Sequence, residues 1–173
     1  TSMKENDWNM NKLNKSVKSI IIFKYEAVDK FGEINKGELI DKSTFFFSRN
    51  GYITEVDYLK GGAIYEQDEK GNLIKQTFLD SDGEPTSVYK YSYDENDYPI
   101  ELSIYYSNGD LDNRIIGKND KRGNTIEESF YDSDGDLEGK RIQQYDENDN
   151  PLRMSLYDAD GDLESSHMYQ YNS

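Results

Sequence analysis

The chain has 173 residues and no cysteine, which excludes disulfide bonds and thiolate chemistry and leaves length for one domain or one repeat array. Its net charge of -15 argues against nucleic acids and anionic membranes as partners, because both would be repelled. Hydrophobic residues make up only 34%, yet 15 Tyr and 7 Phe supply enough apolar surface to favour an ordered fold.

A polar segment, residues 1–17, opens the chain and carries the only tryptophan, Trp8. We expect it to form an N-terminal arm, with Trp8 packed on a sheet. The pattern then changes to the β-branched and aromatic residues 19–29, which predict a strand that ends at the turn-like Lys30-Phe31-Gly32. Its run Ile20–Phe23 is far too short to span a bilayer, so no direct membrane insertion is expected.

Residues 18–51 are predicted to form capping strands and a loop. A second apolar run, residues 44–47, leads to Asn50-Gly51, a strong signal for a β-hairpin. The Gly-, Lys- and Glu-rich residues 32–43 between the two runs are predicted to be a loop. We expect both apolar runs to fold back and complete the core of the sheet that follows.

Residues 52–173 are predicted to be a repeat array. Four copies of a 26-residue unit align without a gap, beginning at Phe78, Ile104, Phe130 and Leu156, and such self-similarity indicates one supersecondary unit used repeatedly. Turn signals alternate at spacings of 12 and 14 residues, which leaves two short strands per unit. We therefore predict an all-β fold, an antiparallel meander of β-hairpins in a strongly twisted or curled sheet, with barrel-like closure left open.

Alternation along these strands predicts one apolar and one polar face. The apolar face is predicted to carry Tyr89, Tyr91, Tyr93, Ile100, Leu102, Ile104, Leu111, Ile115, Ile126, Phe130, Tyr145, Leu152, Met154 and Leu156. Lys90, Ser92, Glu101, Ser103, Glu127, Ser129, Arg153 and Ser155 are predicted to lie on the polar face. Because exposing a continuous apolar face is costly, sheet closure, the N-terminal strands or a second protomer should cover it. A homodimer would use this face or the open edge near Tyr169-Gln170-Tyr171.

The segments YSYDENDYPIELSIYYSNGDL, QQYDENDNPLRMSLYDADGDL and SFYDSDGDL resemble the tyrosine-aspartate (YD) repeats of the Rhs type. Units of that family run Tyr-Asp-x-x-Gly and then an apolar-polar strand, and the likeness extends from Tyr52 onward. Two departures are Asp97 and Asp149, which replace the expected glycine. The repeats are too few for the large shell of long Rhs proteins, and no toxin domain or self-cleaving segment accompanies them. The resemblance implies a short bacterial secreted or surface protein, a β-repeat scaffold outside the cytoplasm, with no ligand identified.

Two Asp-rich turns have the spacing of calcium ligands, since hard cations are bound by several oxygens. They contribute Asp132, Asp134 and Asp136, and Asp158, Asp160 and Asp162. Neither turn continues into a complete EF-hand loop, which has its invariant glycine at position 6 and a bidentate glutamate at position 12. We favour the other interpretation, hairpin turns that use Asp and Gly because both tolerate a positive φ. No cofactor is therefore expected, and calcium remains the open alternative.

Three tyrosines recur at one position of successive units on the predicted polar face, Tyr105, Tyr131 and Tyr157. A row of exposed aromatic rings suits stacking of sugars or anchoring of a protein. Alternatively, each ring packs across a neighbouring strand and stabilises that pair. His167, the only histidine, has no accompanying cysteine, second histidine or Gly-x-Ser-x-Gly turn, so we predict that the chain is not an enzyme.

The sequence thus predicts a non-catalytic β-repeat binding or scaffold module that presents a Tyr-bearing face to a glycan or a protein. The alternative is an acidic immunity or antitoxin protein that neutralises a basic toxin through electrostatic attraction. The first function implies secretion or a surface or periplasmic location, with an export signal removed before Thr1. The second implies a cytoplasmic location.

Overall fold

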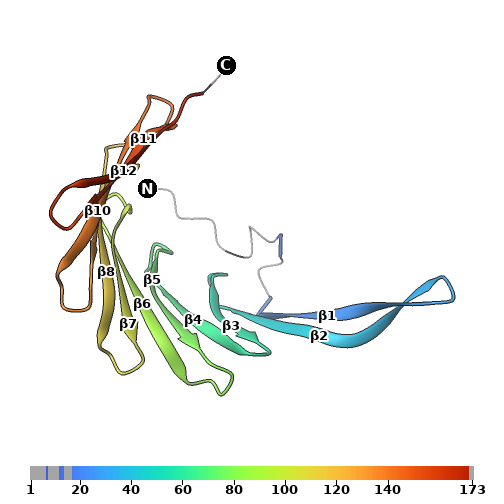
Figure 1. The fold of residues 1–173 in the computed structure, drawn as a ribbon. Helices are drawn as coiled ribbons and strands as arrows, with labels where there is room; N and C mark the ends of the chain where they lie inside the picture. The colour runs from blue at the N-terminus through green and yellow to red at the C-terminus, as the bar shows by residue number, and fades with distance from the viewer. Residues whose placement is uncertain (1–6, 8–11, 14–16, 172–173) are drawn as a thin grey trace. The chain divides into compact units, whose positions relative to one another are not determined.

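A computed structural model describes residues 7, 12–13 and 17–171, and Trp8 with most of the predicted arm lies outside these residues. Twelve strands form one sheet whose order follows the sequence, and every recorded pairing is antiparallel (Figure 1). The strands are β1 (Ser19–Lys30), β2 (Glu33–Phe47), β3 (Ile53–Tyr58), β4 (Gly61–Gln67), β5 (Leu73–Leu79), β6 (Pro85–Tyr93), β7 (Pro99–Tyr106), β8 (Leu111–Asn119), β9 (Thr125–Tyr131), β10 (Leu137–Tyr145), β11 (Pro151–Asp158) and β12 (Leu163–Met168). The predicted all-β meander is confirmed.

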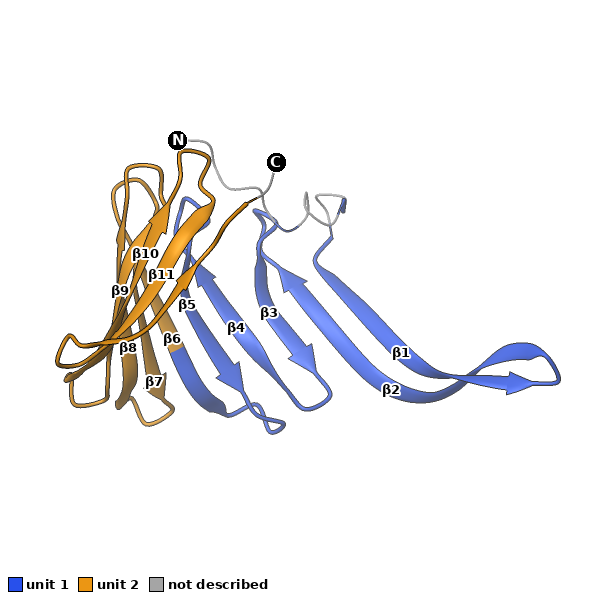
Figure 2. Cartoon of the chain, turned by 45° about the horizontal axis from the view of Figure 1, so that its top comes forward, with its two compact units in different colours: residues 1–88 blue, residues 89–173 orange. Residues whose placement is uncertain are grey.

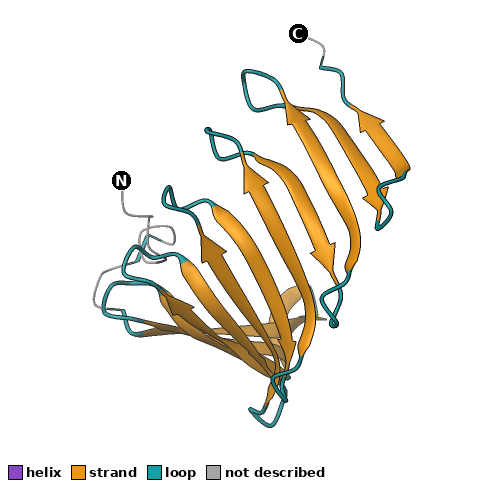
Figure 3. Cartoon of the chain, turned by 90° about the vertical axis from the view of Figure 1, so that its left-hand side faces the viewer, coloured by secondary structure: helices purple, strands orange, loops and turns teal. Residues whose placement is uncertain are grey.

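Barrel closure, which the sequence left open, does not occur. β1 and β12 are the two ends of the strand order, and each pairs with one neighbour only. Short loops join consecutive strands throughout (Figure 3). No helix in the described part of the chain has the length and apolar character needed to cross a membrane.

Contacts divide the chain into two compact units, residues 1–88 and 89–173 (Figure 2). The predicted boundary between residues 51 and 52 falls inside the first unit. The two units are described separately below.

The first unit corrects the prediction that residues 32–43 form a loop, because residues 33–43 belong to the 15-residue strand β2 and only Gly32 lies in a turn. Phe31 and Gly32 both have a positive φ, 59° and 84°, and make the tight turn that sets Lys30 opposite Glu33. The Asp29 carboxylate accepts the Gly32 N–H at 2.9 Å. From that turn the ladder continues to the pair Ser19 and Phe46, so the charged residues between them are strand residues of an exposed ribbon.

A second correction concerns the N-terminal apolar runs, which were expected to fold back over the core. β2 instead pairs edge to edge with β3, and β1 lies beyond it at the end of the sheet. Ile21, Ile22 and Phe23 are consequently about half exposed, at 50%, 53% and 49%. Among the residues that the structure describes, the buried hydrophobic ones are Val56 and Ala63, which lie opposite each other on β3 and β4.

In the second unit, the most buried side chains are small and polar. Ser103, Ser129 and Ser155 recur every 26 residues in the middle of β7, β9 and β11, and each is at most 7% exposed. Longer side chains cover them: Arg114 lies opposite Ser103 and pairs with Glu101 at 2.8 Å. The Ser103 hydroxyl donates to the same carboxylate at 2.9 Å. The predicted polar face is therefore covered by its own ion pairs.

The predicted apolar face of this unit is less uniform than alternation suggested. Its hydrophobic residues are half-buried or exposed, and it also carries an ion pair between Arg141 and Glu128. The Arg141 guanidinium lies 6.0 Å from the centre of the Phe130 ring. Conversely, Ile116 lies on the serine face, opposite Ser129. Each face thus mixes apolar and ionic side chains.

Most hairpins share a five-residue turn. The N–H of the first residue donates to the carbonyl of the fifth, and the N–H of the fourth donates to the carbonyl of the first, with a positive φ at the fourth residue. Asp94–Tyr98 is one of these turns, with Asp97 at φ 65° although it is not a glycine. Such turns occur at 48–52, 68–72, 80–84, 94–98, 106–110, 120–124, 132–136, 146–150 and 158–162.

Candidate binding face

The three predicted tyrosines occupy equivalent positions on one face of the second unit. They lie near the ends of β7, β9 and β11, on the face of the buried serines, and all three are half-buried. On one side each tyrosine pairs with a leucine of the next strand: Tyr105 with Leu111, Tyr131 with Leu137 and Tyr157 with Leu163. The structure therefore places the three predicted tyrosines at equivalent positions of one face and sets a leucine opposite each of them.

A basic residue lies near each tyrosine in the register. The Lys90 ammonium is 4.6 Å from the centre of the Tyr105 ring, a cation–π distance. Arg114 lies opposite Tyr131, and Lys140 lies opposite Tyr157. The row is thus an alternation of aromatic and cationic side chains within a chain that is strongly acidic as a whole.

Carboxylates on the same face are paired with bases. Glu101 is held by Arg114, and Glu127 by Lys118 at 2.9 Å. Burial would raise the pKa of Glu101, but hydrogen bonds from Arg114 and Ser103 and the charge of Arg114 outweigh it and lower that pKa. The face therefore offers rings together with charged hydrogen-bonding groups, which suits a polar ligand that also has an apolar surface.

The six candidate calcium ligands are not brought together. One oxygen of Asp132 accepts the N–H groups of Asp134 and Asp136, at 3.0 and 2.9 Å, and Asp158 accepts the N–H of Asp162 at 2.8 Å. The first carboxylate of each turn is therefore engaged by its own backbone. Within the described ranges no three acidic or histidine side chains form a group that could hold a metal.

His167 lies on β12 opposite Met154, on the face away from the tyrosine row, and it is exposed. Its neighbours across the ladder are therefore those of the predicted apolar face. This position gives it no contact with the candidate binding row in the register.

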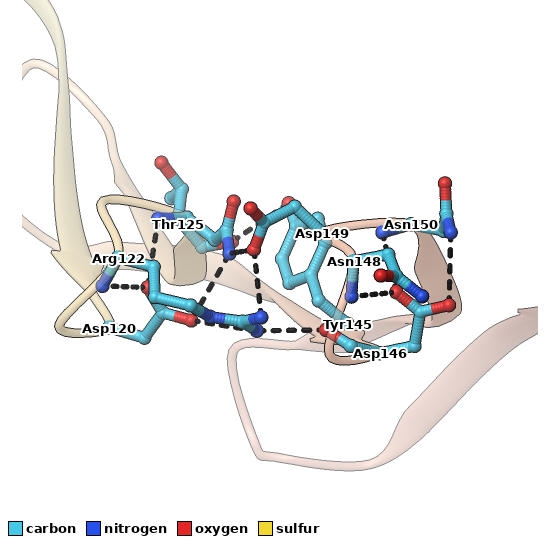
Figure 4. A network of polar contacts seen from close by, with 9 residues as sticks. Asp120, Arg122, Thr125, Tyr145, Asp146, Asn148, Asp149 and Asn150 are labelled. Carbon is cyan, nitrogen blue, oxygen red and sulfur yellow. Dashed lines mark hydrogen bonds and ion pairs between the residues drawn. The ribbon is translucent and has the colours of Figure 1, made fainter.

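A feature that the sequence interpretation missed is the contact between neighbouring turns (Figure 4). The Arg122 guanidinium pairs with Asp149 at 3.0 Å and donates to the Asp146 carbonyl at 2.9 Å. The Asn124 amide also donates to Asp149, at 2.6 Å. Asp149 is one of the two residues that replace the glycine of the repeat. It has a side chain where the repeat expects none, and this side chain links turn 146–150 to turn 120–124 although the backbone φ of Asp149 is positive, at 64°.

At the same end of the strands, two turns that retain the glycine, at Gly71 and Gly123, have an aromatic ring in place of this polar link. A Cβ added at Gly123 would lie 2.3 Å from the ring of Tyr98, and one at Gly71 would lie 2.4 Å from the hydroxyl of Tyr52. Along this end of the strands a turn that ends in Tyr is followed by a Gly turn, and a turn that ends in Asn is followed by an Asp turn. Reading residues four and five of these turns together would have revealed the alternation.

No protein-family model and no curated protein matched the chain. Among solved structures, it is similar to a porin-like protein from Bacteroides uniformis, with 10% identity, 82% of this chain and 56% of that chain covered, and a TM-score of 0.42. A protein of unknown function from Bacteroides fragilis is 16% identical over 86% of this chain and 92% of that chain, with a TM-score of 0.41. A Photorhabdus luminescens Tc holotoxin pore matches at 13% identity over 87% of this chain but 11% of that chain, with a TM-score of 0.28.

Proposed function

We propose that the chain is a non-catalytic β-repeat binding module, exported from a bacterial cell, whose tyrosine row takes a glycan or a protein partner. The observation that carries the proposal is the recurrence of Tyr105, Tyr131 and Tyr157 on one face, each half-buried and each near a cation. Aromatic rings beside charged hydrogen-bonding groups suit both sugars and protein anchors. The resemblance to YD repeats supports export and a scaffold role.

The test is a glycan array and a pull-down with the row replaced by leucine, which keeps an apolar side chain opposite Leu111, Leu137 and Leu163. We expect the triple variant Tyr105→Leu, Tyr131→Leu, Tyr157→Leu to lose at least about tenfold in affinity, since each stacked ring contributes roughly 0.5–1.5 kcal/mol. Tyr106→Leu is the matched control, because Tyr106 is exposed and adjacent but lies at the turn. Unchanged capture of every partner by the triple variant would remove the site.

A second candidate function, neutralisation of a basic protein such as a toxin, is favoured by the acidic turns that directly follow the three tyrosines. Turns 106–110, 132–136 and 158–162 contain seven Asp and no Lys or Arg. An acidic surface of this kind accelerates association with a cationic partner in a salt-dependent way. Replacing Asp134, Asp136, Asp160 and Asp162 by Asn should then weaken capture at low salt, whereas the tyrosine variant should not. Equal effects of salt on both variants would reject this alternative.

A second copy of the chain is a further possible partner, and this homodimer stays a prediction. β1 and β12 are the terminal strands of the sheet, and strands in that position can pair with another chain. Light scattering over a range of protein concentrations would measure the oligomeric state. A homodimer that dissociates when Tyr169 and Tyr171 are replaced by Lys would locate the contact at the β12 end.

A further inference from the structure

The first unit contains a cavity of about 480 Å³, well within the size range of small-molecule sites. It lies over the buried part of that unit, because Val56, 3% exposed, is one of its lining residues. Phe45, Tyr52, Tyr58 and Tyr65 contribute four aromatic side chains to its wall. This cavity belongs to the first unit, whereas the tyrosine row belongs to the second.

The charges around the cavity restrict what it can take. Its ten described lining residues include one carboxylate, Asp7, and no Lys or Arg, so an anion would be repelled. A metal ion would need several oxygen ligands, and no group of three acidic or histidine side chains occurs among the described residues. An organic cation with a diffuse charge does not need oxygen ligands as a metal ion does, because aromatic rings attract it without replacing a hydration shell.

Cations already lie on tyrosine rings elsewhere in the molecule. The Lys36 ammonium is 3.4 Å from the centre of the Tyr25 ring, and Lys90 occupies the corresponding place on Tyr105. The net charge of -15 also raises the local concentration of cations around the chain. In the cavity wall, burial and the neighbouring Tyr58 raise the pKa of Tyr65, which keeps its ring neutral.

We propose that the cavity lined by Phe45, Tyr52, Tyr58, Tyr65 and Asp7 binds an organic cation of the quaternary-ammonium class. The rings surround the alkyl groups, and the Asp7 carboxylate supplies the opposite charge. The Asp7 carboxylate also accepts the Ile53 N–H at 2.5 Å, which fixes this carboxylate beside the start of β3. The site is built from the first strands of the sheet together with a residue of the N-terminal segment.

The decisive measurement compares choline with 3,3-dimethylbutanol, which has the same shape and no charge, by isothermal titration calorimetry on the intact chain. We expect choline to bind at least about tenfold more tightly, because the ring and carboxylate contributions require the positive charge. Equal affinities would reduce the site to an apolar pocket and overturn the proposal. The absence of binding for both compounds up to tens of millimolar would overturn it as well.

Variants locate the binding. Tyr65→Leu removes a ring and should weaken choline binding at least fivefold, whereas Tyr65→Phe keeps the ring and should retain it. Asp7→Asn keeps an oxygen that can accept the Ile53 N–H, so it should lower choline affinity without loss of the fold, and it serves if Tyr65→Leu does not fold. Tyr105→Leu in the second unit is the control and should change nothing. Choline binding that is unaffected by Asp7→Asn and by Tyr65→Leu would place the cation elsewhere.

Discussion

The two ends of the strands in the second unit use the same turn in different ways. At one end lie what we call the clasped turns, 94–98, 120–124 and 146–150, which contact one another through Tyr98 and Gly123 and through Asn124 and Asp149. At the other end lie the open turns, 106–110, 132–136 and 158–162, whose glycines would place a Cβ in empty space. The same turn geometry therefore allows contacts between neighbouring turns at one end of the strands and leaves the turns exposed at the other end.

The comparison shows how a sheet with a small core holds its repeats in register. Hydrophobic burial is modest in this unit, where the buried residues within the described range 89–171 include Ser103, Ser129 and Ser155 but no large apolar side chain. Contacts between the clasped turns link each 26-residue unit to the next, as nearest-neighbour interfaces do in other repeat proteins. The open turns contain seven Asp and no Lys or Arg, and their glycines make no such contacts with a neighbouring turn.

The largest difference between the two ends is expected for alanine at glycine. Gly123→Ala should destabilise the chain by about 2–4 kcal/mol, because the methyl group meets the Tyr98 ring in addition to the cost of a positive φ. Gly135→Ala, at nearly the same φ but with open space around it, should cost only about 1 kcal/mol. Urea unfolding followed by circular dichroism measures both values. Equal costs would mean that the contact with Tyr98 carries no energy.

An exchange of pair types tests whether the alternation of Tyr with Gly and Asn with Asp is a matching rule. Asn124→Tyr alone should be destabilising, because it removes the amide that bonds Asp149 and puts a ring beside a carboxylate. Adding Asp149→Gly recreates the Tyr98 and Gly123 arrangement and should recover about 1 kcal/mol relative to the sum of the single changes. Strict additivity of the two substitutions would refute the rule. Replacements at Asp110 and Gly135, the equivalent positions of the open turns, should show no coupling.

Much of the fold follows from the sequence, because the 26-residue recurrence and the regular turn residues both require a meander of short strands. The loop predicted at residues 32–43 is wrong because it was inferred from composition alone. These residues are charged, but strand pairing along an exposed ribbon tolerates charged side chains. The tyrosine row was predictable from period and alternation. The contacts between the clasped turns were not predicted, since contacts between turns 26 residues apart depend on which strand ends lie side by side. The cavity of the first unit also required the register of β2 to β5.

The smallest expected effect is on the titration of two clasped-turn carboxylates. Hydrogen bonds from Asn150 and Asn148, with the charge of Arg122, outweigh burial and lower the pKa of Asp146. For Asp120, burial would raise the pKa, but N–H groups of Asn124 and Arg122, the Asn124 amide and the Arg122 charge lower it. Because both folded pKa values lie below the unfolded value of about 3.9, the stabilisation is present above that pH and is lost as pH falls through the folded values.

Arg122 acts on both carboxylates, which allows one substitution to separate its charge from the hydrogen bonds. Arg122→Gln should raise the titration midpoints of Asp120 and Asp146 measured by carboxyl NMR, and should leave the remaining lowering from the asparagine donors in place. Lys121→Gln removes a neighbouring charge that acts on neither group and should leave both midpoints unchanged. If the two substitutions shift the midpoints equally, general screening by nearby bases explains the effect, and the guanidinium has no specific place between the two turns.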